Sequence, residues 1–591
     1  MNHARGVCGV GLRYNASMTT KIKRQPPIWI YQLAAIVLAF ISFAMSAYFS
    51  ERTFERLPHL EDEVAYLYQA KMIARGDLVI ETPSPRRAYW QPFIVDFAGK
   101  RFGKYPPGWP MLLSIGVLMG QAWVVNAFFA ALNVALVYRF GRQMFNADVG
   151  LIAAGLMTFS PMALLLNATL MGHTTALFGA TLFLYAYWRM ERITPPLTPP
   201  RLRGGESLSA RAPLKIERIQ PQRRKGYEEK QHVSTQVGGT YMSSLRSIKW
   251  GVIAGVGLGM VIFNRPLTGV GVALPFVLWS GLYLLYTLVR RRELFVTRLK
   301  PHLALGIVAL LFAGTIGLHN YLAVGDATFN LYTLVWEYDK IGFGEDVGRE
   351  GHTLERGLRQ THYDLTLTAA DLFGWQLGRI TPELQDHLRS RSINWPVTGL
   401  SWVLLPFGVL LGWRRRWTYL LLAIPAALIA LHVAYWIGAQ RYSTRYYFEA
   451  LSAVALLSAL PVAWLARRTS RLLVYVVLTA VFVNSFITYS IPRIDALYRY
   501  NRISPVQIEQ VQARRSDEKP LLVIITGEDV RWRAFGSLMA VTSPYLDSDI
   551  VVAWDDTRLG VRQAILDRFP DRELIDLIGN VNEWHFADAA A

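Results

Sequence analysis

The stretch LPHLEDEVAYLYQA, residues Leu57–Ala70, directly follows the first long apolar segment of the chain. That segment, Ile28–Phe49, comes after the basic stretch KIKRQ and is long enough to cross the core of a bilayer as a helix. A cleaved signal peptide has a shorter apolar core of about 7–15 residues, so Ile28–Phe49 is interpreted as an uncleaved first span. Three acidic residues, Glu61, Asp62 and Glu63, therefore lie where a membrane span has just ended.

The composition is that of a polytopic membrane protein. Of the 591 residues, 52% are hydrophobic and 18% are charged, whereas soluble domains carry about 25% charged residues. The formal net charge is +19, but the basic residues form short clusters at the ends of apolar runs, which is the pattern that sets membrane orientation. Nucleic acid is therefore not expected as a partner. The single cysteine, Cys8, excludes an internal disulfide and a cysteine metal cluster.

Basic clusters also assign a side to each loop. With KIKR in the cytoplasm, residues 1–27 form a disordered cytoplasmic tail and the acidic stretch lies outside. The apolar piece Gly108–Gly120 is too short to span, and interpreting it as a re-entrant or juxtamembrane helix keeps Arg139 and Arg142 on the cytoplasmic side. The further predicted spans are Trp123–Tyr138, Ala147–Leu166, Thr174–Trp188, Trp250–Phe263, Leu267–Val289, Leu303–Leu318, Val397–Trp413, Trp417–Ile437, Phe448–Leu465 and Leu472–Ile491.

The predicted fold class is an all-α polytopic membrane protein with about eleven transmembrane helices between residues 28 and 491. Outer loops are expected at 50–122 and 319–396. The alternation of charge places the N-terminus inside and the C-terminus outside, and we expect the chain in a bacterial cytoplasmic membrane.

Two stretches fall outside the membrane pattern. Residues 191–247 contain TPPLTPPRLRGGESLSA and show no apolar period, which predicts a disordered cytoplasmic insertion; an arm that binds anionic lipid is the alternative. After Pro492 the chain becomes polar, and Pro520–Thr526 and Asp549–Trp554 have the pattern of buried strands alternating with the helix-like RLGVRQAILDRF. Residues 492–591 are therefore expected to form a small α/β domain outside the membrane.

Unusual polar residues gather at loops on the predicted outer side. Acids at 61–63 either complement the dipole in the first turn of a helix or include a general base for an acceptor hydroxyl. Lys104 stands before the prolines that open the Gly108–Gly120 helix; it is either a snorkelling side chain or a functional cation. Arg265 is a lone arginine at an outer turn between apolar helices, where it needs an anion or a carbonyl as partner.

Further polar residues stand at other outer turns. His173 lies at one of them, where a lone histidine is more often structural. The stretch QRYSTRYYFEA places Arg441, Arg445 and Glu449 at the outer mouth of two helices. Since Arg445 and Glu449 are four residues apart, pairing with each other is one expectation for them.

The order of these motifs is similar to that of a known family. A first span is followed by DE at Asp62 and Glu63, by KYPPG from Lys104, and by SP at Ser160 and Pro161 before a short outer turn. In this order the chain resembles the GT-C membrane glycosyltransferases, especially the protein O-mannosyltransferases and the aminoarabinose transferase of lipid A. The resemblance runs from about residue 28 to residue 491, outside the insertion. NRPLTGVGVALPF, NYLAVGDATF, GFGEDVGREGHT and RYYFEAL are similar to recurrent pieces of a bacterial subgroup.

The resemblance implies transfer of a sugar from a polyprenyl-phosphate donor to an acceptor hydroxyl outside the membrane, usually with inversion. The acceptor is a glycan, a lipid or a protein. The family pattern implies that Asp62 is the base, that Glu63 is its neighbour in the pair, and that Lys104 lies near the donor phosphate. Arg265 and Arg445 are added, from their depth, as further phosphate contacts. The residues expected to line the substrate pocket are Tyr66, Tyr105, His173 and Arg441.

The chemistry limits the number of catalytic groups. A phosphate leaving group needs cations rather than a general acid, so one base is enough, unlike the two carboxylates of glycoside hydrolysis. Two alternatives stay open: a lipid-linked glycan polymerase or ligase with a diphosphate donor, and a transporter or flippase, which would need internal repeats. No metal site is assigned, although Glu345, Asp346 and His352 share one outer loop and leave a divalent metal possible.

Overall fold

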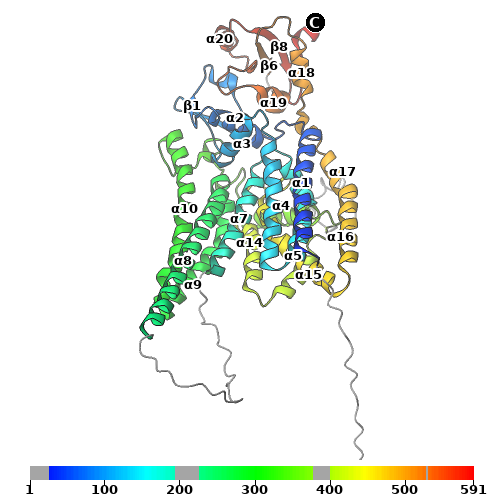
Figure 1. Ribbon diagram of the computed structural model, residues 1–591. Helices are drawn as coiled ribbons and strands as arrows, with labels where there is room; N and C mark the ends of the chain where they lie inside the picture. Colours follow the sequence, from blue (N-terminus) through cyan, green and yellow to red (C-terminus); the bar gives the residue numbers. More distant parts are fainter. Residues whose placement is uncertain (1–25, 194–224, 377–398, 528–529, 591) are drawn as a thin grey trace, which may run out of the picture.

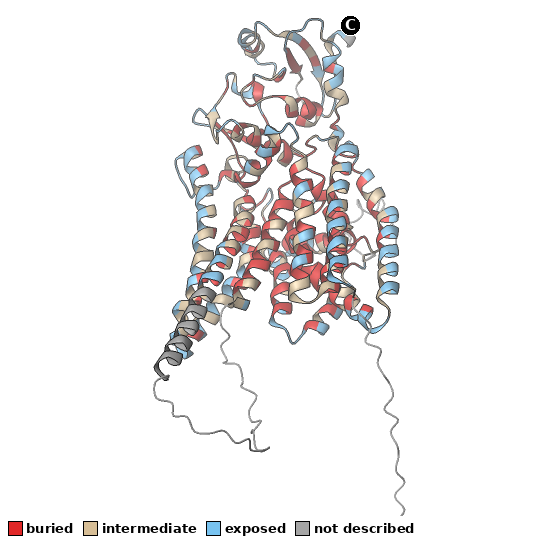
Figure 2. Ribbon diagram, viewed as in Figure 1, coloured by how far each residue is buried: buried red, intermediate tan, exposed pale blue. Residues whose placement is uncertain are grey.

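A long bundle of helices carries a small α/β domain at one end (Figure 1). The computed structural model describes residues 26–193, 225–376, 399–527 and 530–590. We call the end with the α/β domain the outer end, following the predicted orientation. Figure 2 shows buried residues concentrated in the middle of the bundle and exposed residues along the helices on its flanks. Many of these exposed residues are large and apolar, as expected for helices that face lipid.

Within the described residues, seven helical segments are long and apolar enough to cross a membrane. Their elements are α1 (Ile28–Arg52), α4 (Val124–Met144), α8 (Lys225–Asn264), α9 (Pro266–Arg290), α10 (Arg292–Val324), η3 with α15 (Arg445–Ala450, Leu451–Arg468), and α16 with η4 and α17 (Arg471–Ser485, Phe486–Ser490, Ile491–Asp495). The class of fold is confirmed: the chain is a polytopic helical membrane protein with a small α/β part.

A bent pair, α5 (Ala147–Thr158) and α6 (Pro161–Asn167), meets at 59° and is long and apolar enough for an eighth span when its two helices are counted together. The SP motif makes the bend: the Ser160 hydroxyl accepts from the Ala163 N–H, and Pro161 occupies the first turn of α6. Three other predicted spans correspond to α7 (His173–Ile193), to the nine-residue α13 (Leu404–Gly412) and to α14 (Arg416–His432). The total of eleven spans stays a prediction.

The predicted disordered insertion is wrong at both of its ends. Helix α7 continues to Ile193 and α8 begins at Lys225, so of residues 191–247 only 194–224 lie outside the described residues. Glu191 shows the reason, since its carboxylate accepts from the indoles of Trp279 and Trp417, on α9 and α14. Contacts between distant helices extend α7 beyond the point where its own apolar pattern ends.

The outer layer is built from two loops between spans. The first contains α2 (Glu61–Ile73), a three-stranded antiparallel sheet of order β1-β3-β2 (Ile80–Glu81, Lys100–Gly103, Ile94–Phe97), η1 (Arg86–Tyr89) and α3 (Gly108–Leu118). Short α3 packs beside α2 at the outer end, as the re-entrant or juxtamembrane interpretation predicts (Figure 1). The second loop contains η2 (Leu331–Leu334) and α11 (Leu354–Asp371). A short hairpin of β4 (Gln440–Arg441) and β5 (Ser443–Thr444) precedes η3.

The C-terminal part is a four-stranded sheet of order β7-β6-β8-β9. Strands β6 (Leu521–Thr526), β7 (Ile550–Asp555) and β8 (Glu573–Gly579) are parallel, and β9 (Trp584–Phe586) is antiparallel to β8. The two predicted strands and the helix α20 (Val561–Arg568) stand where the sequence pattern places them. The other elements are η5 (Tyr500–Arg502), α18 (Val506–Gln512), α19 (Trp532–Val541) and η6 (Ala587–Ala590).

Helix α2 joins the C-terminal domain to the bundle. Val64 on α2 belongs to the hydrophobic core of the domain, together with Leu521 and Val523 of β6. On the same helix, the Lys71 ammonium donates to the carbonyls of Ala540 and Thr542, at 2.6 and 3.0 Å. The domain is therefore packed onto the helix whose first turn carries the acidic residues.

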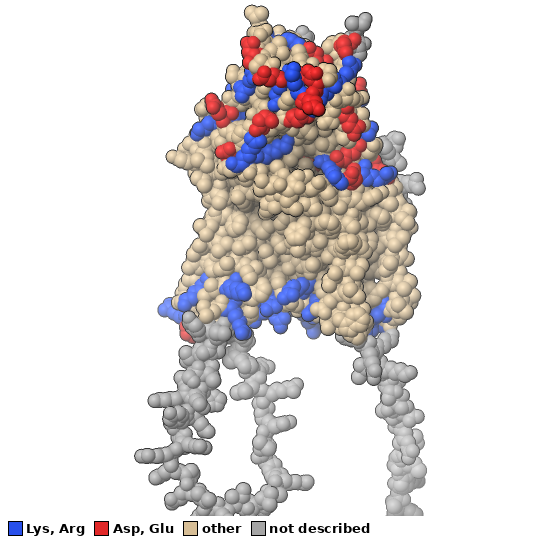
Figure 3. All heavy atoms as spheres, turned by 45° about the horizontal axis from the view of Figure 1, so that its top comes forward, with Lys and Arg blue, Asp and Glu red and all other residues tan. Residues whose placement is uncertain are grey.

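Charge is unevenly distributed along the molecule. Figure 3 shows a broad uncharged belt with Lys and Arg below it, and residues of both signs on the outer end above it. The triplets Arg290–Arg292 and Arg414–Arg416 lie at the α9–α10 and α13–α14 turns, at the end away from the C-terminal domain (Figure 1). This distribution is typical of a protein with that end in the cytoplasm; the orientation of the termini stays a prediction.

Candidate active site

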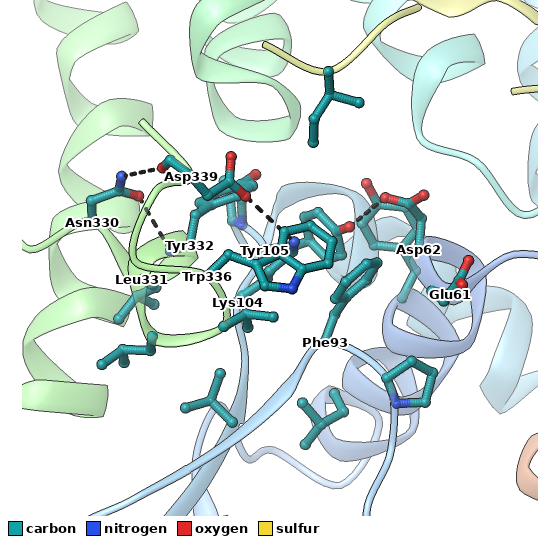
Figure 4. Close-up of a pocket in the computed structure, with 18 of the residues that line it drawn as sticks. Glu61, Asp62, Phe93, Lys104, Tyr105, Asn330, Leu331, Tyr332, Trp336 and Asp339 are labelled. Atoms are coloured by element: carbon teal, nitrogen blue, oxygen red, sulfur yellow. Dashed lines mark hydrogen bonds and ion pairs between the residues drawn. The ribbon is translucent and has the colours of Figure 1, made fainter. Parts of the chain in front are cut away.

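A cavity of about 1180 Å³ lies in the outer layer of the molecule. Its walls come from the start of α2, residues 86–106, the α8–α9 turn, Ile316 and Asn320 of α10, residues 329–341, residues 432–446 and Trp532 of α19. Segments from the first outer loop, from the second outer loop and from the C-terminal domain thus meet around one space. Figure 4 shows part of this lining, with Asp62 on one side and Asp339 on the other.

Asp62 lies in the first turn of α2 and faces the cavity. The Tyr105 hydroxyl donates to one carboxylate oxygen, and Arg445 Nη1 donates to the other at 3.2 Å. Burial opposes ionisation, but Arg445, the Tyr105 hydroxyl and Lys104 together hold the pKa of Asp62 below its ordinary value. Asp62 is therefore an ionised acceptor inside the cavity.

Glu63 takes no part in the cavity lining, contrary to its assignment as a catalytic neighbour. One residue further along α2 turns its side chain by about 100°, and the carboxylate points into the protein. There it accepts from the backbone N–H groups of His59, Leu60 and Leu170, at 2.9, 3.1 and 2.7 Å, and from the Tyr442 hydroxyl. Burial raises the pKa of Glu63 to about 7. The contacts make Glu63 an anchor for the start of α2.

Glu61 and Trp532 form a part of the cavity wall that the sequence motifs do not identify. The Trp532 indole donates to the Glu61 carboxylate at 2.8 Å. Trp532 opens α19 in the C-terminal domain, 471 positions along the chain from Glu61. No local pattern around Trp532 signals this contact, because it depends on how the domain packs against α2.

Lys104 lies at the cavity with its ammonium among four aromatic rings. The distances from Nζ to the ring centroids are 3.7 Å for Phe93, 4.6 Å for Trp336, 5.1 Å for Tyr332 and 5.2 Å for Tyr105. Burial lowers the pKa of Lys104 to about 8, while nearby Asp62 and Asp339 oppose this shift.

Asp339 faces Lys104 with 3.7 Å between Oδ2 and Nζ. It lies in the second outer loop, more than two hundred positions from Lys104 in the sequence. Asp339 was not expected as a site residue, since only the folding of that loop over the cavity brings it close.

Arg265 also lines the cavity, at the turn between α8 and α9. Its guanidinium lies 3.4 Å from a Glu449 carboxylate oxygen, and its Nη1 lies 2.6 Å from His173 Nε2. His173 and Glu449 are fully buried behind it and do not line the cavity. The prediction that His173 lines the substrate pocket is therefore wrong; its ring contacts a residue that does.

The expected pairing of Arg445 with Glu449 is also wrong. Arg445 pairs with Asp62, at 3.2 Å, and Glu449 pairs with Arg265. The reason is local: residues Arg445–Ala450 form the 3₁₀ helix η3, in which a turn takes about three residues, so side chains four apart do not share a face. The tighter helix turns Arg445 toward the cavity and Glu449 into the bundle.

The other three residues predicted to line the substrate pocket do line the cavity. Tyr66 and Tyr105 line the cavity, with their ring centroids 4.6 Å apart. Arg441 lines it as well, with an exposed side chain that donates to the Gln440 carbonyl. The structure thus brings Asp62, Tyr66, Lys104, Tyr105, Arg265, Arg441 and Arg445 to one cavity and leaves Glu63 and His173 behind its wall.

Two of the three loop residues considered for a metal, Asp346 and His352, have other contacts. Asp346 pairs with Lys340 at 2.6 Å, and His352 Nε2 lies 2.9 Å from the Val433 carbonyl. Over the described parts of the chain, no group of three or more His, Cys, Asp or Glu side chains is arranged to hold a metal ion.

No protein-family model matches the chain, and no curated protein matches it in sequence. Among solved structures, ArnT from Cupriavidus metallidurans in the apo state aligns over 93% of this chain and 92% of its own, with a TM-score of 0.50 and 13% identity. The chain has the GT-C fold. ArnT bound to undecaprenyl phosphate gives a TM-score of 0.49 at 15% identity over the same shares of the two chains.

A second GT-C protein is also similar. Archaeal oligosaccharyltransferase AglB from Archaeoglobus fulgidus, in complex with an inhibitory peptide and a dolichol-phosphate, aligns over 93% of this chain and 69% of its own, with a TM-score of 0.43 and 13% identity. At these identities the likeness is one of fold. Since a shared fold does not fix a function, the residues of the cavity decide its chemistry.

Proposed function

We propose that this chain is a glycosyltransferase that moves a sugar from a polyprenyl-phosphate donor to an acceptor hydroxyl on the outer side of a bacterial cytoplasmic membrane, with inversion. The observation that carries this proposal is that an ionised carboxylate and three cations face one cavity. The carboxylate is Asp62, and the cations are Lys104, Arg265 and Arg445. The acceptor is a glycan, a lipid or a protein.

The lining of the cavity supports a lipid-borne donor. Pro266 and Leu267 at the start of α9, and Ile316 on α10, contribute apolar surface where the cavity meets the membrane helices. A polyprenyl chain fits apolar helices of this kind, while its phosphate needs the cations above them. ArnT, whose apo form shares this fold, has also been solved with undecaprenyl phosphate bound.

In the proposed reaction, Asp62 accepts the proton of the acceptor hydroxyl while the oxygen attacks the anomeric carbon of the sugar. The bond from that carbon to the phosphate oxygen breaks, and its electron pair stays on the leaving polyprenyl phosphate. Lys104, Arg265 and Arg445 stabilise the charge that the phosphate gains. Attack from the side opposite the leaving group inverts the anomeric carbon.

Arg445 links the two halves of this reaction. In the structure it holds the pKa of Asp62 low, which makes the carboxylate a weak base. A donor phosphate bound to the Arg445 guanidinium would share its charge and weaken the pair with Asp62. The pKa of Asp62 would then rise, so the carboxylate becomes a better base when the donor is in place.

A second candidate, a polymerase or ligase that uses a lipid-diphosphate donor, is favoured by additional cations on the cavity wall. Arg86, Arg87 and Arg441 line the cavity with exposed side chains, and a diphosphate carries more negative charge for them to bind. The two candidates differ in the lipid released, which is a monophosphate in one case and a diphosphate in the other.

The experiment uses the full-length protein in liposomes with radiolabelled sugars on undecaprenyl monophosphate or on undecaprenyl diphosphate, and native membranes as the source of acceptor. We expect transfer from a monophosphate donor and release of undecaprenyl phosphate. Transfer from the diphosphate donors alone would support the second candidate. Movement of either lipid across the bilayer without cleavage of the sugar bond would show a flippase and overturn both.

A further inference from the structure

The surroundings of Lys104 differ from those of an ordinary buried lysine. The side chain is 3% exposed, and rings from three segments surround the ammonium: Phe93 just before β2, Tyr105 after β3, and Tyr332 and Trp336 in the second outer loop. Ring faces attract a cation but leave its three N–H donors without strong acceptors. An ammonium in such a box keeps the capacity to bind an anion.

Asp339 is fixed on the side away from Lys104. Its Oδ1 accepts from the Trp436 indole at 3.1 Å and from the Tyr435 hydroxyl at 3.4 Å. Its Oδ2 is buried, accepts no hydrogen bond, and faces the Lys104 ammonium at 3.7 Å. The two aromatic donors therefore hold one carboxylate oxygen, and the other oxygen faces the cation.

The distance of 3.7 Å matters for function. It lies well beyond the 2.7–2.9 Å of a charge-assisted hydrogen bond, so Asp339 stabilises the positive charge without occupying an N–H donor at close range. An anion that enters the cavity does not have to break a tight ion pair before it binds. The arrangement resembles a cation held ready for a ligand more than a structural salt bridge.

We propose that Asp339, oriented by Trp436 and Tyr435, is a positioning residue that keeps the Lys104 ammonium charged and centred in its aromatic box, ready for the phosphate of the lipid donor. This inference rests on the proposed function and adds to it a residue that acts through Lys104. Asp339 is itself an anion and would repel the phosphate. It therefore acts by keeping the Lys104 ammonium protonated and in position.

The charged groups around Lys104 come from several elements. Asp339 and Asp62 favour the protonated ammonium, Arg445 opposes it, and burial opposes it most. Loss of the Asp339 charge removes one of the two favourable partners, so the lysine loses its proton at lower pH. Phosphate binding should therefore weaken as pH rises through about 8. Without the Asp339 charge, the same weakening should occur at lower pH.

The experiment measures binding of undecaprenyl phosphate to the purified full-length protein between about pH 6 and about pH 9.5, a range that includes the Lys104 transition. In wild type, affinity should fall as pH rises through about 8. Asp339→Asn should move this fall to lower pH by about one unit, which makes binding about fivefold weaker near pH 8 and close to tenfold weaker near pH 9.5. Asp339→Glu keeps the negative charge, so its binding curve should lie close to that of the wild type.

Two variants serve as controls. Asp346→Asn changes the other lysine-paired carboxylate of the same loop, which is exposed and lies outside the cavity, and should leave the curve unchanged. Lys104→Arg replaces the titrating group with a guanidinium that stays charged, so affinity should lose its fall at alkaline pH and become insensitive to Asp339→Asn in the double variant. Trp436→Phe is a milder change that removes one donor to Asp339. It should shift the curve to lower pH, as Asp339→Asn does, but by a smaller amount.

Each outcome separates two explanations. A uniform loss of affinity at every pH in Asp339→Asn, or an unchanged curve, overturns the positioning role while the proposed function stands. If Asp339→Asn does not fold, the curves of Trp436→Phe and Lys104→Arg decide in the same way. Wild-type protein that binds no undecaprenyl phosphate at any pH overturns the proposed function and this inference with it.

Discussion

Arg445 and Asp62 are 383 positions apart in the sequence and lie 3.2 Å apart in the structure. The pair joins η3, at the outer end of a buried helix of the bundle, to the first turn of α2 beneath the C-terminal domain. Both side chains line the cavity. The proposed base and one of the cations proposed to hold the leaving group are therefore in direct contact.

Replacement of the proposed base, Asp62, tests the centre of this arrangement. Asp62→Asn keeps the size of the side chain but cannot accept a proton, so the rate of sugar transfer should fall by at least about 10²-fold. Binding of undecaprenyl phosphate should persist, because the cations remain. Asp77→Asn is the matched control, since Asp77 is on the same outer loop and also accepts from a tyrosine hydroxyl, that of Tyr545. Full activity in Asp62→Asn would refute the assignment of the base.

Loss of the cation in the pair should change the pH profile as well as the rate. Arg445→Gln removes a group that holds the pKa of Asp62 below its ordinary 3.8, so burial should raise that pKa. Since Asp62 must be ionised to act, the acid limb of kcat/KM should move to higher pH, with a rate loss of about 10²–10³-fold. The control is Arg75→Gln, which breaks an exposed pair with Asp547. An acid limb that stays in place would show that Arg445 does not set the state of Asp62.

Loss of the hydrogen bond that anchors the start of α2 should lower the stability of the protein. Tyr442→Phe removes the hydroxyl that donates to the buried Glu63 carboxylate, which should cost about 1–3 kcal/mol and lower the unfolding midpoint of the detergent-solubilised protein. Tyr498→Phe, which removes a long 3.4 Å contact to Glu55 at the surface, should leave the midpoint unchanged. Equal midpoints in both variants would contradict the role given to Glu63.

The contact between the C-terminal domain and α2 can be tested by limited proteolysis. Lys71→Met leaves the carbonyls of Ala540 and Thr542, at the end of α19, without their ammonium donor. The domain should then open more often, and limited proteolysis should cleave near residues 496–520 sooner than in wild type. Lys100→Met, which loses an exposed contact to the Leu322 carbonyl, provides the control. Unchanged cleavage in Lys71→Met would mean that apolar packing alone holds the domain.

Much of the fold follows from patterns that the sequence displays directly. Apolar runs and basic clusters identify the bundle, and the strand pattern identifies the C-terminal sheet. Asp62 and Lys104 are found because the motifs that carry them are local. Asp339 and Trp532 carry no such signal, since each reaches the cavity through the folding of a distant segment. The errors have the same origin: η3 is a tighter helix than the spacing of Arg445 and Glu449 suggests, and Glu191 is ordered by indoles from two other helices.

The insertion of Val64 into the core of the C-terminal domain has a pharmacological consequence. The interface between α2 and α19 lies at the outer end of the molecule, next to the cavity proposed for the lipid-borne donor. A binding protein or a compound that separated α19 from α2 would displace the start of α2, which carries Asp62. It would act as an inhibitor without competing against a membrane-dissolved substrate.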